Sequence, residues 1–115
     1  MCRGLRVLVA APNGEAAAAL RRASVAAQWE VVAAAEGLDQ LEAELETSRP
    51  DVVVVDAGLG PEAVAAVRRL RPRARLVSVG RLDGVDLATD SPDDVRAAIL
   101  GLPGPGGPVR TSPQR

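Results

Sequence analysis

Residues 49–62 read RPDVVVVDAGLGPE, and this stretch decides the fold. Four consecutive valines between Asp51 and Asp56 predict a short strand buried on both faces, because a half-exposed strand would alternate apolar and polar residues. Pro61 then opens a helical pattern, at a position where its fixed φ and missing N–H cause no loss. Asp56 is therefore expected at the carboxyl end of a parallel strand, the edge at which open α/β sheets bind ligands.

The composition is that of a soluble globular domain, and it excludes several kinds of chemistry. The 115 residues are 47% hydrophobic and 25% charged, and the net charge of −1 gives no reason to expect nucleic acid as a partner. There is no His, and every basic residue is Arg, so a histidine base and a lysine nucleophile are both excluded. The single Cys2 excludes an internal disulfide and a cysteine zinc cluster. We expect no enzyme, no cofactor and no metal site.

The N-terminus lacks a signal-peptide core, and no apolar run approaches the length of a membrane span. These two observations predict a cytoplasmic protein without membrane contact.

Periodicity along the chain predicts alternating strands and helices. The expected strands are 5–11, 29–34, 51–56, 75–80 and a weak 85–88, and the expected helices are 15–27, 38–48, 61–70 and 91–101. This order predicts an α/β, flavodoxin-like, doubly wound parallel sheet with three layers and strand order 2-1-3-4-5. We expect one domain over residues 1–102, and a flexible Pro/Gly-rich tail or linker over 103–115.

The connection between the fourth and fifth strands is too short for a helix. Only residues 80–84 separate them, whereas a parallel crossover with a helix needs about a dozen residues. A missing helix would leave apolar side chains without cover, and such a patch often marks an interface. The alternative is that Leu82 and the loop fold over the gap. The candidate interface residues are Leu76, Val77, Val79, Val85 and Leu87.

Several strings, in order, resemble the receiver domain of bacterial response regulators over roughly residues 5–102. They are LRVLVAAPNGEAAAALRRA at 5–23, EVVAAAEG at 30–37, PDVVVVD at 50–56 and SPDDV at 91–95. The third string is similar to the receiver segment that ends on the phosphoacceptor aspartate, which places Asp56 at that position.

The resemblance also implies a site that this chain lacks in large part. Receivers hold Mg²⁺ with an acid pair after the first strand, and add a hydroxyl after the fourth strand and a lysine after the fifth. Asp56 is therefore expected to be vestigial. The corresponding positions are Ala10 and Ala11 for the acid pair, Val79 for the hydroxyl (or Ser78 after a shift of one residue) and Ala88 for the lysine.

The resulting prediction is a degenerate, phosphorylation-independent receiver-like module for protein interaction or homodimerisation in bacterial signalling. One alternative is a two-component receiver phosphorylated on Asp56. Another is the N-terminal placement domain of a pilus-assembly-type P-loop ATPase, and a third is a small-ligand-binding flavodoxin-like domain. The arginines at 69, 71, 73 and 75 form either an anion or nucleic-acid patch or a solvated helix end. Acidic residues elsewhere offset their charge and no aromatic residue is present nearby for base stacking, which favours the helix end.

Overall fold

The computed structural model describes residues 5–102, so the expected tail at 103–115 lies outside the described residues. The strands are β1 (Leu5–Ala11), β2 (Trp29–Glu36), β3 (Val52–Asp56), β4 (Arg75–Val79) and β5 (Leu87–Thr89). The helices are α1 (Gly14–Ser24), α2 (Gly37–Ser48), α3 (Pro61–Leu70) and α4 (Val95–Leu100), with two 3₁₀ turns, η1 (Ala57–Leu59) and η2 (Pro92–Asp94).

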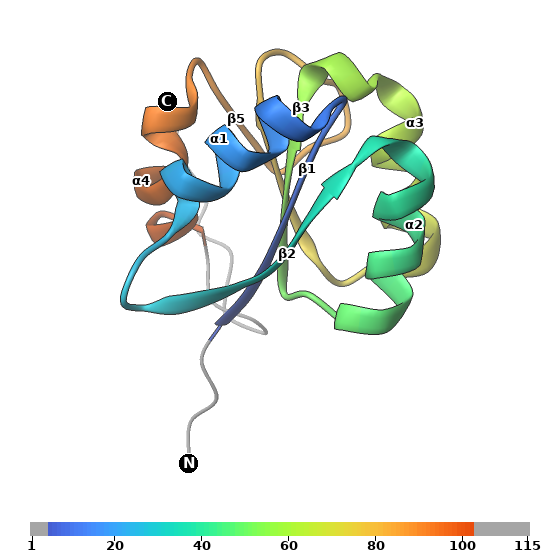
Figure 1. The fold of residues 1–115 in the computed structure, drawn as a ribbon, viewed down its shortest axis with the longest axis horizontal. Coiled ribbons are helices and arrows are strands. Elements are labelled where there is room, and N and C mark those ends of the chain that lie inside the picture. Colours follow the sequence, from blue (N-terminus) through green and yellow to red (C-terminus); the bar gives the residue numbers. More distant parts are fainter. Residues whose placement is uncertain (1–4, 103–115) are drawn as a thin grey trace, which may run out of the picture.

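The five strands form one parallel sheet in the order β2-β1-β3-β4-β5, which confirms the predicted topology. The valine strand β3 lies at its centre. Val53 is in register with Leu8 of β1 on one side and with Leu76 of β4 on the other. Figure 1 shows α2 and α3 covering one face of this sheet, and α1 and α4 covering the other.

The alternating side chains of β3 divide the core into two halves. Val53 and Val55 pack in the half beneath α2 and α3, whereas Val52 and Val54 pack in the half beneath α1 and α4. All four valines are at most 2% exposed. A run of four valines without a polar residue is therefore explained by a strand that is covered on both faces.

Two aspartates extend the sheet by one residue at its amino edge. Asp51 donates its N–H to the Arg6 carbonyl at 2.8 Å, and its Oδ2 accepts the Arg6 N–H at 2.9 Å. Asp86 does the same toward Leu76, with distances of 2.8 and 2.7 Å. Each aspartate lies directly before its strand. Its carboxylate accepts a backbone N–H of the neighbouring strand, which the carbonyl of one more strand residue would otherwise accept. Both carboxylates thereby accept a hydrogen bond from a backbone N–H.

The segment between β4 and β5 contains no helix, as predicted. Arg68 of α3 holds this segment, since its Nη2 donates to the Gly84 carbonyl at 2.8 Å and lies 3.4 Å from Asp86 Oδ2. Leu82 and Val85 pack against the core half beneath α2 and α3. The loop therefore folds over the gap, as the second of the two alternatives predicts.

The prediction that Leu76 and Val77 lack cover is wrong, because both side chains are 0% exposed. Leu76 belongs to the core half beneath α2 and α3, against which the loop residue Leu82 also packs. Val77 points to the opposite face, where α4 covers it. The error arises from alternation along β4, since only every second side chain faces the side from which the helix is missing.

Two predicted helix boundaries move. α1 ends at Ser24 instead of 27, where the Ser24 carbonyl accepts the Trp29 Nε1–H at 2.7 Å and anchors the turn into β2. The last helix begins as a 3₁₀ turn. Ser91 caps this turn, as expected, by accepting the Asp93 N–H at 3.2 Å, and α4 follows from Val95.

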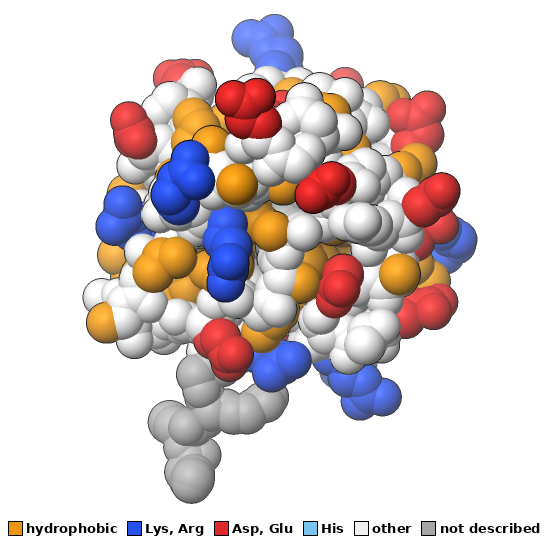
Figure 2. Space-filling model, in the orientation of Figure 1, with side chains coloured by type: hydrophobic (Ala, Val, Ile, Leu, Met, Phe, Trp, Pro, Cys, Tyr) orange, Lys and Arg blue, Asp and Glu red, His pale blue; other side chains and the backbone are white. Residues whose placement is uncertain are grey.

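Acidic and basic side chains are interspersed on the face seen in Figure 2, with small apolar areas between them. Within residues 5–102, no helix is long and apolar enough to cross a membrane.

Candidate functional site

Asp56 lies where the sequence places it, at the carboxyl end of the central strand, and is half-buried. Its Oδ1 accepts the Gly58 N–H at 2.8 Å and so caps η1. This is the local turn that an aspartate forms with a backbone donor two residues on. The Asp56 carboxylate makes no other hydrogen bond or ion pair within residues 5–102. One carboxylate oxygen therefore stabilises the loop.

The two positions of the expected acid pair are filled by methyl groups. Ala10 and Ala11 are 0% exposed at the carboxyl end of β1. Ala10 is in register with Val55, next to Asp56, so a carboxylate at this point of β1 would have been a neighbour of Asp56. Among the residues that the structure describes, no group of three or more His, Cys, Asp or Glu side chains is arranged to hold a metal ion.

The loop after β1 closes against the loop after β3. A Cβ placed on Gly58 would lie 2.9 Å from Pro12 Cγ and 3.3 Å from Asp56 Oδ1, so the proline ring and the carboxylate flank the same glycine. Pro12 has no backbone N–H to donate, and its side chain contains no oxygen that could bind a cation. The residue that follows β1 therefore brings a hydrocarbon ring to the loop that Asp56 caps.

Another carboxylate at this edge, that of Glu36, is directed elsewhere. β1 separates β2 from β3, which places the ends of these strands roughly 10 Å apart at the usual strand spacing. A Cβ on Gly14 would lie 2.9 Å from Glu36 Oε2, so this carboxylate sits over the first turn of α1. There its charge complements the helix dipole.

The hydroxyl groups near Asp56 are committed to backbone atoms. Val79 is in register with Asp56 and provides no hydroxyl. Ser78 is 0% exposed, and its Oγ donates to the Gly80 carbonyl at 2.7 Å. Thr89, which the sequence interpretation did not single out, is in register with Val79, and its Oγ1 donates to the Ser78 carbonyl at 3.1 Å. Ala88, at the expected lysine position, is exposed.

Of the candidate interface residues, three retain exposed area. Val79 and Val85 are half-buried, and Leu87 is 38% exposed on the edge strand β5. Apart from Val79 at the end of β4, the remaining candidate surface is β5 and the segment that precedes it.

A groove of about 900 Å³ lies at the opposite, amino edge of the sheet, and we call it the amino-edge groove. The sequence interpretation missed it, because the residues that line it come from separate strand starts that only the fold brings together. Its lining includes aliphatic side chains, arginines and two aspartates, namely Leu5, Val52, Ile99, Leu102, Arg68, Arg71, Arg73, Arg75, Asp51 and Asp86.

The fold is that of response-regulator receiver domains. The chain is similar to the signal receiver domain of NarL from Mycobacterium tuberculosis, with 22% identity, a TM-score of 0.67, and coverage of 86% of this chain and 95% of that one. It is also similar to the response regulator domain of CheB from Thermotoga maritima (18% identity, TM-score 0.65, coverage 85% and 92%). A third similar structure is the REC domain of RcsB from Salmonella enterica serovar Typhimurium (14%, 0.68, 85% and 87%).

No family model matches the chain, and no curated protein matches it. At identities of 14–22%, the likeness to solved structures establishes the fold.

Proposed function

We propose that this chain is a receiver-like module of bacterial signalling that acts through protein contacts in the cytoplasm, without phosphoryl transfer to Asp56 and without catalysis of its own. The observation that carries the proposal is the isolation of Asp56. Ala10 and Ala11 bring methyl groups to the acid-pair positions, and Pro12 packs beside Gly58. Mg²⁺ needs several oxygen ligands, and phosphoryl transfer needs its developing charge neutralised.

The contact surface of this proposal is β5 and the segment before it. β5 has three residues and, within residues 5–102, pairs only with β4, so its outer backbone edge could pair with another chain. Leu87 adds an exposed aliphatic side chain to this edge. A surface of this kind suits a protein partner or a second copy of the chain.

Light scattering of the purified chain, with and without substitution of Leu87, tests the surface. Leu87→Ser is expected to shift a self-associating chain toward monomer, or to weaken capture of a partner. Val25→Ser is the matched control, because Val25 is 53% exposed but lies between α1 and β2. A strict monomer that captures no partner through Leu87 would contradict this part of the proposal.

Treatment with acetyl phosphate and Mg²⁺ tests the proposal that Asp56 receives no phosphoryl group. Retention of the unmodified mass is expected. A phosphoryl adduct that disappears in Asp56→Asn would instead favour a working two-component receiver.

A further inference from the structure

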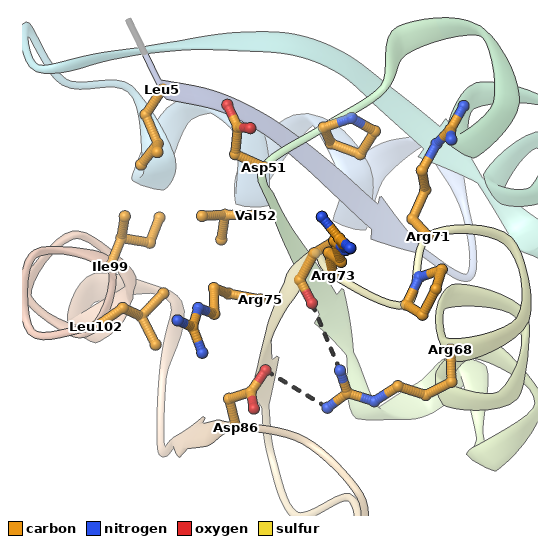
Figure 3. A pocket seen from close by; sticks show the side chains of 13 residues that line it. Leu5, Asp51, Val52, Arg68, Arg71, Arg73, Arg75, Asp86, Ile99 and Leu102 are labelled. Atoms are coloured by element: carbon orange, nitrogen blue, oxygen red, sulfur yellow. Dashed lines mark hydrogen bonds and ion pairs between the residues drawn. The ribbon is translucent and has the colours of Figure 1, made fainter. Parts of the chain in front are cut away.

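The amino-edge groove has an apolar half and a basic half. Figure 3 shows Leu5, Val52, Ile99 and Leu102 together on one side, beside the starts of β1 and β3 and the end of α4. Arg68 and Arg71, at the end of α3, lie on the other side, with Arg73 and Arg75 between the two halves. A ligand that fills the groove therefore meets aliphatic surface at one end and guanidinium groups at the other.

The carboxylates that line the groove are committed to the backbone. Asp51 accepts the Arg6 N–H, and Asp86 accepts the Leu76 N–H at 2.7 Å as well as lying 3.4 Å from Arg68. Four arginines line the groove against these two aspartates. The groove therefore carries an excess of positive charge.

Two of the arginines keep their charge available. Arg71 donates to the carbonyls of Leu45 at 2.7 Å and Glu46 at 3.1 Å, and these neutral acceptors orient the guanidinium without neutralising it. Arg73 is exposed and makes no hydrogen bond or ion pair within residues 5–102. Charge-assisted contacts to a carboxylate are stronger than contacts to neutral acceptors, so an anion would be preferred here.

The chain's own terminal segments are a poor electrostatic match. Residues 1–4 and 103–115 adjoin groove residues Leu5 and Leu102, but neither segment contains an Asp or Glu side chain. Their charged side chains are Arg3, Arg110 and Arg115, which carry the same sign as the groove. Nucleic acid is disfavoured as well, since the lining contains no aromatic side chain on which a base could stack.

We propose that the amino-edge groove is a docking site for a short acidic peptide segment of a partner protein, with an aliphatic side chain next to its carboxylates. The aliphatic side chain lies against Leu5 and Leu102, and the carboxylates face Arg71 and Arg73. This site is at the edge of the sheet opposite to Asp56. Its lining shares only Asp86 with the segment that precedes β5, and it includes no residue of β5 itself. Failure of peptide binding would therefore leave the proposed function untouched, and the reverse also holds.

The test is fluorescence anisotropy of the full chain with a labelled hexapeptide, Asp-Leu-Glu-Leu-Asp-Glu. Binding is expected to weaken with salt, and replacement of both peptide leucines by serine is expected to weaken it at least about tenfold. Arg73→Glu is expected to weaken binding by about tenfold or more, and the matched variant Arg81→Glu by less than about twofold. Both variants change the net charge equally, and Arg81 is also exposed but follows β4 at the other edge of the sheet.

Amide resonances locate the bound peptide. The chemical shifts of Val52, Ile99 and Leu102 are expected to change during the titration, whereas those of residues 104–115 are expected to stay the same.

Four results would overturn the proposal. These are no binding of the acidic peptide, equal losses for Arg73→Glu and Arg81→Glu, tighter binding of an oligo-dT strand than of the peptide, and a shift of the amide resonances of residues 104–115 when the peptide binds. The last result would identify the chain's own tail as the occupant.

Discussion

Replacing Asp86 by alanine removes the side chain that extends the β4–β5 pairing by one residue. Asp86 Oδ2 accepts the Leu76 N–H at 2.7 Å and lies 3.4 Å from Arg68 Nη2. The variant keeps the backbone bond from the Asp86 N–H to the Leu76 carbonyl. The substitution therefore isolates the contribution of the carboxylate.

The hydrogen bond accounts for most of the expected loss. A hydrogen bond to a charged acceptor contributes about 1.5–3 kcal/mol, and water can reach the vacated position, which favours the lower end of that range. The Arg68–Asp86 pair adds less than about 1 kcal/mol, because its side chains are 37% and 32% exposed and solvent screens the charges. We expect Asp86→Ala to lower the free energy of unfolding by about 2 kcal/mol, or the melting temperature by about 8 °C for a domain of this size.

Urea unfolding followed by the fluorescence of Trp29, the sole and buried tryptophan, measures this loss. Asp86→Asn keeps an oxygen acceptor and is expected to lose only about half as much stability. Arg68→Ala and the double variant complete a cycle whose coupling energy is expected below about 1 kcal/mol. A loss under about 0.5 kcal/mol for Asp86→Ala, or a coupling energy equal to the whole loss, would refute the reasoning.

Two further predictions concern the packing of loops. Gly80 has a φ of +97°, and a Cβ there would lie 2.8 Å from Ala57 Cβ, so Gly80→Ala is expected to lower stability by about 2 kcal/mol in thermal melts. Gly101 has a φ of −84°, and Gly101→Ala is the control, expected within about 0.5 kcal/mol of wild type; equal effects of the two substitutions would contradict the contact. Trp29→Phe removes the 2.7 Å bond to the Ser24 carbonyl and is expected to lose about 1 kcal/mol in urea unfolding followed by circular dichroism. Unchanged stability would show that this bond contributes nothing.

Much of the topology is predictable because its signals are local. The valine run, Pro61 at the first position of α3 and the alternation of strand and helix patterns lead to the observed strand order. The short interval after β4 also predicts the missing helix, since the number of residues limits what the chain can form.

The burial of individual β4 side chains was not predictable from the sequence. Leu76 and Val77 are adjacent in sequence but face opposite layers, and each layer has a different cover. The same limit applies to the carboxylates of Asp51 and Asp86. The sequence predicts both residues in strands, but only the register shows that each side chain lies next to an N–H of the neighbouring strand.

At the candidate site, too, the sequence predicts the local feature but not the contacts between distant segments. The sequence places Asp56 at the carboxyl end of the central strand, because a buried run ends there. It does not reveal that Pro12 packs against Gly58, since this contact depends on how two loops meet. The amino-edge groove was missed for the same reason, because it is assembled from the starts of β1, β3 and β4 and the ends of α3 and α4.

The isolation of Asp56 is the central claim, and intact-mass measurement after incubation with acetyl phosphate and Mg²⁺ tests it most directly. We predict an unchanged mass for the wild-type chain and for Asp56→Asn, because Ala10 and Ala11 stand at the acid-pair positions and no metal-binding group of three acidic side chains is found within residues 5–102. A phosphoryl adduct on the wild-type chain that requires Mg²⁺ and is absent from Asp56→Asn would contradict the account.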